Sequence, residues 1–278
     1  MTVAVSVLIP AHNEAGYITP CLTALFASAP QMPGMKVEVL VLANGCSDAT
    51  ATTARMAKCP ENWQLRVLER DGGSKTGALN QGDAAAQGSI LVYLDADVVV
   101  EPDLLPQIAA ALETGSARYA SGTPVVTRAR SACTRAYARV WSQLPFVRSG
   151  TPGFGLFAMS RAGRARWGRW PDIISDDTFA RLNFTAAERL RLPARYHWPM
   201  AEGFRNLVRV RRRQNQGVAE IGQLFPALLA NDDRRRLTVL RLMTLTLRFP
   251  GGMLVYLAVT LGVKSPIFRS RDSWARGR

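Results

Sequence analysis

At residues 91–98 the chain reads Leu91-Val92-Tyr93-Leu94-Asp95-Ala96-Asp97-Val98, a short apolar run that ends in two carboxylates. Apolar residues in an uninterrupted run of this length are typical of a buried strand. The strand would deliver Asp95 and Asp97 into the loop that follows. Two carboxylates so placed can bind a hard divalent cation, which prefers oxygen ligands. Alternatively, they form only a turn or a helix cap, where Asp is also common.

Working outward from this segment, further apolar runs alternate with helix-like segments. The alternation predicts an α/β fold with a mostly parallel central sheet and helices on both faces. Ligands of such sheets bind at the carboxyl ends of the strands, where Pro10, Asn44 and Asp95 fall. The strand-like runs are Val3–Ile9, Val37–Leu42, Leu65–Leu68 and Ile90–Leu94, and the helical segments are Tyr17–Ala27, Asp48–Lys58 and Lys75–Ala86.

After residue 100 the pattern changes to helices at Asp103–Glu113 and Ser131–Leu144, with a glycine- and proline-containing break at Gly150–Gly155. We expect residues 101–204 to complete the sheet and to form the second wall of a cleft. Beyond residue 204 the composition shifts to arginine and long apolar segments. The sequence therefore predicts three parts, at 1–100, 101–204 and 205–278, the last being a helical, basic extension.

The bulk composition limits the class of protein. A chain of 278 residues, 47% of them hydrophobic, suffices for one sizeable α/β domain and a short extension. The four cysteines show no C-x-x-C spacing, and together with two histidines they supply no zinc site. The N-terminal residues lack the basic stretch and the cleavage site of a secretory signal, so we expect the catalytic body in the cytoplasm.

The formal charge of +14 is unevenly placed. Residues 205–278 hold 15 Lys and Arg against 4 Asp and Glu, so +11 of it lies in the last quarter. Arg211–Arg213 and Arg234–Arg236 bracket apolar stretches, and no nucleic-acid-binding signature accompanies them. Phe249–Val263 is uncharged over fifteen residues, fewer than the ~20 that span a bilayer. We expect a helix pair lying on an anionic membrane surface; a solvated basic face is the alternative.

Four motifs occur in order over about a hundred residues and together resemble the family 2 glycosyltransferases. They are Ile9–Glu14, Asn44–Asp48, Gly73–Asn80 and Asp95–Asp97, which are similar to the family's P-x-x-N-E, D-D-G-S-x-D, G-K-x-x-A-L-N and D-x-D motifs. Ser175–Thr178 resembles the family's E-D acceptor motif, and Arg209–Gly217 a weakened Q-x-x-R-W region. The resemblance implies an inverting, nucleotide-sugar-dependent transferase with a glycosyltransferase A-type, Rossmann-like fold.

On the donor side, the resemblance implies that residues 1–100 bind the nucleotide sugar. His12 would stack on the base, unless it is a satisfied loop histidine, and Lys75 at a helix start would approach the diphosphate, unless it is merely solvated. Ala43 and Asn44 stand where the family usually has two aspartates, which leaves the nucleobase open. The residues expected to contact the nucleotide sugar are Pro10, Ala11, His12, Glu14, Asn44, Lys75 and Asp95.

For the chemistry, the resemblance implies Mg²⁺ or Mn²⁺ on Asp97 and Asp95, and a general base at Asp177 with Asp176 beside it. The two carboxylates at 176 and 177 also suit a helix N-terminus, and both roles can coexist. The acceptor loop would be Gly153, Phe154 and Gly155, and the departing diphosphate would meet Arg209 and Arg212.

We therefore expect a glycosyltransferase that moves a sugar from a nucleoside diphosphate sugar to an acceptor hydroxyl with inversion, using a divalent metal. Its partners would be the donor, an unidentified hydroxyl acceptor and an anionic membrane surface, with no nucleic acid. It would lie in the cytoplasm, peripheral to the inner face of the cell membrane. A nucleotidyltransferase on a related fold and a non-catalytic peripheral scaffold are the alternatives; donor hydrolysis without acceptor separates the scaffold from an enzyme.

Overall fold

The computed structural model describes residues 4–233 and 237–265, which form two compact units. The first unit contains the described residues up to Val125, together with Gly153–Asp172 and Asp176–Trp198. The second contains Val126–Pro152, Ile173–Ser175 and the described chain from Pro199 onward. This grouping differs from the division expected at residues 100 and 204, since residues 126–152 associate with the C-terminal quarter of the chain.

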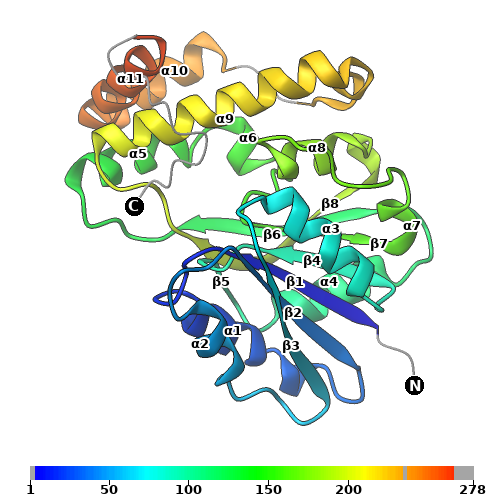
Figure 1. Ribbon diagram of the computed structural model, residues 1–278. Helices are drawn as coiled ribbons and strands as arrows, with labels where there is room; N and C mark the ends of the chain where they lie inside the picture. Colours follow the sequence, from blue (N-terminus) through cyan, green and yellow to red (C-terminus); the bar gives the residue numbers. More distant parts are fainter. Residues whose placement is uncertain (1–3, 234–236, 266–278) are drawn as a thin grey trace. The chain divides into compact units, whose positions relative to one another are not determined.

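One eight-stranded sheet organises the first unit, in the order β3-β2-β1-β4-β7-β6-β8-β5 (Figure 1). Strands β3, β2, β1 and β4 are parallel neighbours, whereas β7 runs antiparallel to β4 and β6. The predicted α/β fold is confirmed, and the sheet is mixed because β7 runs antiparallel to both of its neighbours and β5 runs antiparallel to β8. The strands are β1 (Val5–Ala11), β2 (Val37–Asn44), β3 (Trp63–Arg70), β4 (Ile90–Leu94), β5 (Val99–Val100), β6 (Tyr119–Val126), β7 (Leu156–Ser160) and β8 (Arg189–Trp198).

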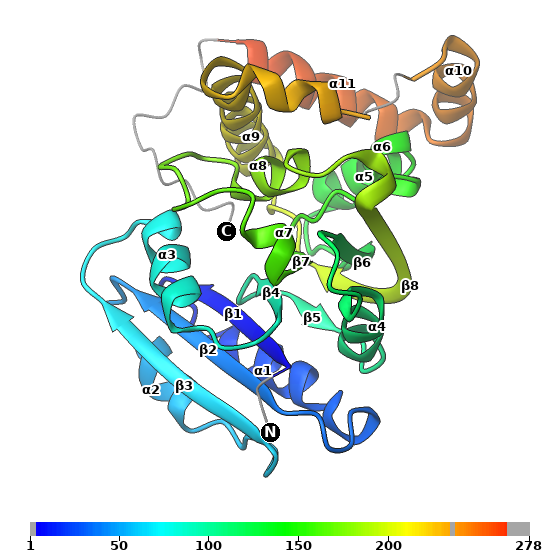
Figure 2. The same cartoon turned by 90° about the vertical axis from the view of Figure 1, so that its right-hand side faces the viewer.

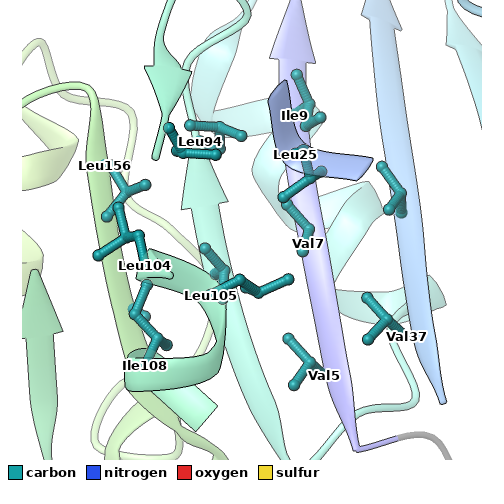
Figure 3. Close-up of a cluster of buried hydrophobic side chains, with 14 of the residues drawn as sticks. Val5, Val7, Ile9, Leu25, Val37, Leu94, Leu104, Leu105, Ile108 and Leu156 are labelled. Atoms are coloured by element: carbon teal, nitrogen blue, oxygen red, sulfur yellow. The ribbon is translucent and has the colours of Figure 1, made fainter. Parts of the chain in front are cut away.

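Helices cover both faces of this sheet (Figure 2). Val5, Val7 and Ile9 of β1 point to one face and pack in a continuous apolar cluster with α1 and α4 (Figure 3). On the other face, Gly82 of α3 lies so close to Leu8 and Leu42 that an added Cβ would come within 2.7 Å of each side chain. Strand β1 is buried on both sides as a result, which explains its continuous apolar sequence.

The helices of the first unit begin close to where the sequence predicts them. Ser74 caps α3, because its side chain accepts a hydrogen bond from the Gly77 amide at 3.1 Å, and this fixes Lys75 as the first helical residue. The helices are α1 (Ile18–Phe26), α2 (Thr50–Arg55), α3 (Lys75–Ala85), α4 (Leu104–Leu112), α7 (Arg161–Arg164) and α8 (Asp176–Leu182), with short 3₁₀ turns η1 (Ala29–Gln31) and η2 (Ala186–Glu188).

The second unit is helical, and its helix α11 packs against α5 and α9. Met253 of α11 is buried with Val140 of α5 and Leu245 of α10 in a small apolar cluster. Among the described residues no single helix could cross a membrane; α10 and α11, bent by 119° where they meet, are a candidate only as a pair. The unit comprises α5 (Ala132–Trp141), α6 (Pro145–Arg148), α9 (Phe204–Leu224), η3 (Pro226–Asn231), α10 (Val239–Arg248) and α11 (Pro250–Lys264).

Two arginines of α9 are used inside this unit. Arg211 donates to the hydroxyls of Tyr137 and Tyr256, at 3.0 and 3.1 Å, and its guanidinium lies over both rings. Arg212 donates to the carbonyl oxygens of Gly262, Val263 and Ser265, which closes the carboxyl end of α11. These arginines therefore hold α11 in place. Arg234–Arg236, expected to flank the apolar stretch, lie outside the described residues.

Substitutions at Gly251 and Gly252, at the start of α11, test whether the inner face of this helix, the one toward α5, is packed. Gly252→Ala places a Cβ 2.8 Å from the Ala136 carbonyl oxygen and 3.0 Å from Val140, so α11 must move from α5. We expect a loss of about 1–3 kcal/mol in unfolding free energy, measured by thermal or urea denaturation.

Gly251→Ala is the matched control, because the Cβ added there meets nothing within 4 Å. Alanine is the better helix former, so this variant should be unchanged or more stable by up to about 1 kcal/mol. Equal effects of the two substitutions would show that the inner face of α11 is not packed as described.

Candidate active site

The Asp95–Asp97 loop follows β4 directly and is held by backbone hydrogen bonds. The Asp95 amide donates to the Gly155 carbonyl at 2.9 Å, and the Val98 amide donates back to the Asp95 carbonyl at 3.1 Å. Ala96 and Val98 are buried, whereas the carboxylate-bearing side chains of Asp95 and Asp97 are partly exposed. The tight turn therefore anchors its apolar residues in the core and leaves two carboxylates at the sheet edge.

Lys75 joins this loop to the second carboxylate pair. Its ammonium Nζ lies 3.0 Å from Asp95 Oδ1 and 3.1 Å from Asp176 Oδ2. Burial by itself would lower the pKa of Lys75, but the attraction of Asp176 and then of Asp95 outweighs it and raises that pKa. The side chain is therefore a cation at neutral pH, and it brings together the start of α3, the end of β4 and the start of α8.

Asp176 and Asp177 occupy the first turn of α8 in different surroundings. Asp176 is buried against Lys75, while Asp177 is partly exposed and accepts a hydrogen bond from the Thr178 amide at 2.6 Å. Burial, and next the negative charge of Asp176, raise the pKa of Asp177 to about 6, although Lys75 opposes the shift. A pKa near neutrality suits a general base, and Asp177 meets that condition.

On the predicted nucleotide side, hydrogen bonds join the loops that follow β1 and β2. The Asn44 carbonyl accepts a 2.6 Å hydrogen bond from His12 Nδ1, and this bond fixes the orientation of the His12 ring. Asn13 adopts a positive φ of 54° and accepts from the Ser47 amide at 2.6 Å. Asp48 accepts from the amides of Thr50 and Ala15, and the N-cap of α2 is the residue after it, Ala49. The loops after β1 and β2 thus form one connected edge.

Four residues of that edge differ in exposure. Ala11 and Asn44 are buried, whereas Pro10 and Glu14 are partly exposed. The side-chain oxygen of Asn44 has no hydrogen-bond partner among the described residues, and Ala43 beside it is also buried. The end of β2 therefore presents an amide and a methyl group where a carboxylate pair would carry negative charge.

The glycines of the 153–155 loop are required by close packing within the first unit. Gly153 has a φ of +73°, and a Cβ added there would lie 1.8 Å from the Tyr119 hydroxyl. Gly155 has a φ of +75° and lies against Trp198 and Val98. Tyr196 donates to the Phe154 carbonyl at 2.9 Å. Since the Gly155 carbonyl also accepts from the Asp95 amide, this loop positions the Asp95–Asp97 turn.

Sequence reasoning missed Asp83, one of the two side chains that fix α3. Asp83 accepts hydrogen bonds from Tyr93, Arg164 and Trp170 at 2.6, 2.6 and 2.7 Å. Asn80 pairs with the backbone of Trp170 in both directions, at 2.8 and 3.2 Å. A signal was available in the tryptophans at 167 and 170, which flank the Arg164 guanidinium at 4.8 and 5.3 Å, but their partner on α3 was not evident.

The two arginines expected at the diphosphate lie on α9 in the second unit. Arg209 is exposed, and Arg212 makes the hydrogen bonds to the end of α11 described above. To reach a diphosphate, Arg212 would have to give up those bonds.

The residues present supply part of a divalent-metal site. Within residues 4–233 and 237–265, no group of three or more His, Cys, Asp or Glu side chains could hold a metal ion. Asp95 and Asp97 offer carboxylate oxygens, which suit Mg²⁺ or Mn²⁺, but an octahedral ion needs further ligands. The donor set fits a metal whose remaining ligands come from a phosphate-bearing substrate or from water.

Comparison with solved structures places this fold among known enzymes. Glucosyl-3-phosphoglycerate synthase from Mycobacterium tuberculosis, solved with Mn²⁺, UDP and glucosyl-3-phosphoglycerate, superposes with a TM-score of 0.54 at 22% identity, over 80% of this chain and 79% of that one. TarS residues 1–349 from S. aureus, solved with UDP, give a TM-score of 0.53 at 14% identity, over 94% and 83%. At these identities the likeness establishes the shared glycosyltransferase A-type fold.

Sequence relatives include the glycosyltransferase AglE of Haloferax volcanii, 38% identical over 34% of this chain and 30% of the relative. The dolichol-phosphate mannosyltransferase of Saccharomyces cerevisiae is 26% identical over 58% of this chain and 62% of the relative. The matches thus span less than two thirds of these relatives' length. The family model named glycosyl transferase family 2 matches residues 6–169, more than half of the sequence. Motif order, fold and match agree, and the chain belongs to glycosyl transferase family 2.

Proposed function

We propose that this chain transfers a sugar from a nucleoside diphosphate sugar to an acceptor oxygen with inversion at the anomeric carbon. The observation that carries the proposal is the Lys75 bridge, because it gathers the Asp95–Asp97 turn and the Asp176–Asp177 pair around one cation. A donor needs positive charge near its diphosphate, and an acceptor hydroxyl needs a base. Lys75 would supply positive charge on the diphosphate side, and Asp177 would be the base.

The reaction assigns a role to each carboxyl group of α8. The acceptor oxygen attacks the anomeric carbon from the face opposite the diphosphate, and the bond from that carbon to the phosphate oxygen breaks with its electron pair on the nucleoside diphosphate. Asp177 accepts the proton of the acceptor hydroxyl, for which a pKa of about 6 is suitable at neutral pH. Asp176, held by Lys75, keeps that pKa raised through its charge.

The donor would be held by the edge formed by β1, β2 and α3. Pro10, Ala11, His12, Glu14 and Asn44 would contact the nucleoside, and Lys75 and Asp95 the diphosphate and sugar side. Since Asn44 is neutral, base recognition would depend on amide hydrogen bonds rather than on a carboxylate. Arg209 and, if its bonds to α11 are released, Arg212 would meet the departing diphosphate.

A bound Mg²⁺ or Mn²⁺ would neutralise the diphosphate and so make it a better leaving group. Asp97 and Asp95 are the residues that would hold it. The Mn²⁺ in the glucosyl-3-phosphoglycerate synthase complex supports the use of a divalent ion on this fold. The carboxyl groups of Asp95, Asp176 and Asp177 around Lys75 also leave this cluster net negative before a cation arrives, which would favour metal binding.

The acceptor class is suggested by relatives named for lipid phosphates, among them dolichol-phosphate mannosyltransferase and undecaprenyl-phosphate transferases. We propose an acceptor at the inner face of the cell membrane, with the enzyme peripheral to it in the cytoplasm. A hydroxyl acceptor requires Asp177 as base. A lipid phosphate has a second pKa near 6 and already presents an ionised oxygen, so it would depend on Asp177 far less. Gly153, Phe154 and Gly155 remain candidate acceptor contacts in addition to their packing role.

Asp97→Asn tests the metal assignment. We expect nucleoside diphosphate release from UDP-glucose or GDP-mannose to fall at least ~10²-fold, with EDTA abolishing the wild-type reaction and Mn²⁺ or Mg²⁺ restoring it. Glu113→Gln, an exposed carboxylate after α4, is the control and should retain full activity. Undiminished turnover of wild type in EDTA would refute the metal requirement.

Asp177→Asn tests the general base through donor hydrolysis, in which water replaces the acceptor. The rate should fall about 10²–10⁴-fold while UDP or GDP affinity, measured calorimetrically, stays unchanged. In wild type, kcat/KM should decline tenfold per pH unit below about pH 6, because protonated Asp177 cannot accept a proton. A rate loss seen only for Asp176→Asn would transfer the role to that residue.

The same substitution should stabilise the fold at neutral pH. A raised carboxyl pKa means that the folded state binds its proton more tightly than the unfolded state, so wild-type stability falls as pH rises from about 4 through 6. A shift of about two pKa units in this partly buried group corresponds to at most ~3 kcal/mol. Asp177→Asn should therefore melt higher than wild type at pH 7–8, and the difference should vanish near pH 4. A lower melting temperature at pH 8 would contradict the raised pKa.

A further inference from the structure

Exposed apolar side chains of the described chain gather on α10 and α11. Of the twelve large hydrophobic residues that are exposed, eight lie between residues 239 and 261. Two are among the most exposed of all: Leu247 at 82% and Leu240 at 76%. Scattered exposed leucines are ordinary on a soluble surface, but a concentration of this kind marks an interaction site. The eight are Val239, Leu240, Leu242, Met243, Leu247, Leu254, Leu257 and Leu261.

These side chains form one stripe on each helix. Leu240, Met243 and Leu247 follow the spacing i, i+3, i+7 on α10, and Leu254, Leu257 and Leu261 repeat it on α11. The opposite face of α11 is occupied, since Met253 and Val259 are buried in the second unit. Helix α11 is therefore apolar on two faces, one of which is packed and one of which is not.

The polar groups on this surface are already satisfied. The hydroxyls of Thr244, Thr246 and Thr260 each donate to the backbone carbonyl four residues earlier, at 2.9, 2.9 and 2.7 Å. Arg212 closes the carboxyl end of α11 in the same way, by donating to its last carbonyls. Because these donors already have partners within the helix, the surface could enter an apolar medium without leaving a hydrogen-bond donor unpaired.

The charges around the stripes are of one sign. Residues 237–264 contain Arg241, Arg248 and Lys264 and no Asp or Glu. Arg248 is exposed, with its guanidinium 5.3 Å from the Phe249 ring centroid, and Lys264 is exposed at the end of α11. Apolar stripes bordered only by cations complement the apolar interior and anionic headgroups of a lipid leaflet.

The geometry favours a surface position over a span. Helix α10 has 10 residues and α11 has 15, and the chain bends by 119° between them. At 1.5 Å per residue neither reaches the ~30 Å of a bilayer core. From these observations we propose that α10 and the outer face of α11 form one docking surface that enters a single leaflet of an anionic membrane, anchored to the protein by the inner face of α11.

This inference rests on the membrane-peripheral part of the proposed function and specifies its contact residues. The arginines of α9 that hold α11 are not part of the surface, because Arg211 and Arg212 bind tyrosines and helix carbonyls. The apolar stripes rather than the arginine run should therefore set the affinity for lipid, and the cations should add preference for anionic headgroups.

Flotation of the full chain with phosphatidylcholine vesicles, with and without phosphatidylglycerol, tests the proposal. Wild type should float with both, and more strongly with the anionic vesicles at low salt. Leu240→Glu/Leu247→Glu should weaken partitioning at least about tenfold, since it places two charges on the exposed stripe that would enter the lipid. Met56→Glu is the matched control, because Met56 is 79% exposed in the first unit and should have no effect.

Two further measurements separate a loss of membrane docking from a loss of transferase activity and from a change in oligomeric state. Donor hydrolysis by Leu240→Glu/Leu247→Glu should equal that of wild type, so a failure of the transferase chemistry would not imitate a failure of docking. Light scattering without lipid should show the same mass for both proteins. The proposal is overturned if wild type ignores both vesicle types, if the double variant floats as well as wild type, or if the substitutions instead dissociate a dimer of this chain.

Discussion

The ammonium of Lys75 is the contact on which the candidate site depends. It lies 3.0 Å from Asp95, which follows β4, and 3.1 Å from Asp176, which begins α8 far along the sequence. Without a cation there, the carboxylates would repel one another and the start of α8 would lose its link to β4. The position of Lys75 is itself determined locally, because the Ser74 cap makes it the first residue of α3.

Two supports keep that geometry fixed. Asn80 and Asp83 hold α3 to the Trp170 segment, and the Gly155 carbonyl holds the Asp95 amide. Glycines are needed at 153 and 155 irrespective of any ligand, because both have a positive φ and neighbouring side chains leave no room for a Cβ. The loop that the sequence suggested for the acceptor thus also positions the Asp95–Asp97 turn.

The basic C-terminal quarter contains two groups of residues with different roles: arginines that pack within the unit, and exposed apolar and basic residues. Arg211 and Arg212 form hydrogen bonds that hold α11 in place, so that helix is an integral element of the second unit. The exposed leucines of α10 and α11 are left on the surface together with unopposed cations. High positive charge by itself did not distinguish these roles, because an arginine that stacks on tyrosines and one that stays exposed look alike in a sequence.

The sequence by itself determined the local features: the alternation that gives β1 to β4 and their helices, the cap before Lys75, the carboxylate turn after β4 and the family. These follow from hydrophobic period and from turn and cap chemistry, which act over a few residues. Only the tertiary structure decided that Lys75 pairs with Asp176, that burial and the charge of Asp176 raise the pKa of Asp177 to about 6, and which face of α11 is packed. Burial and pairing between segments tens of residues apart set those properties, and no local pattern encodes them.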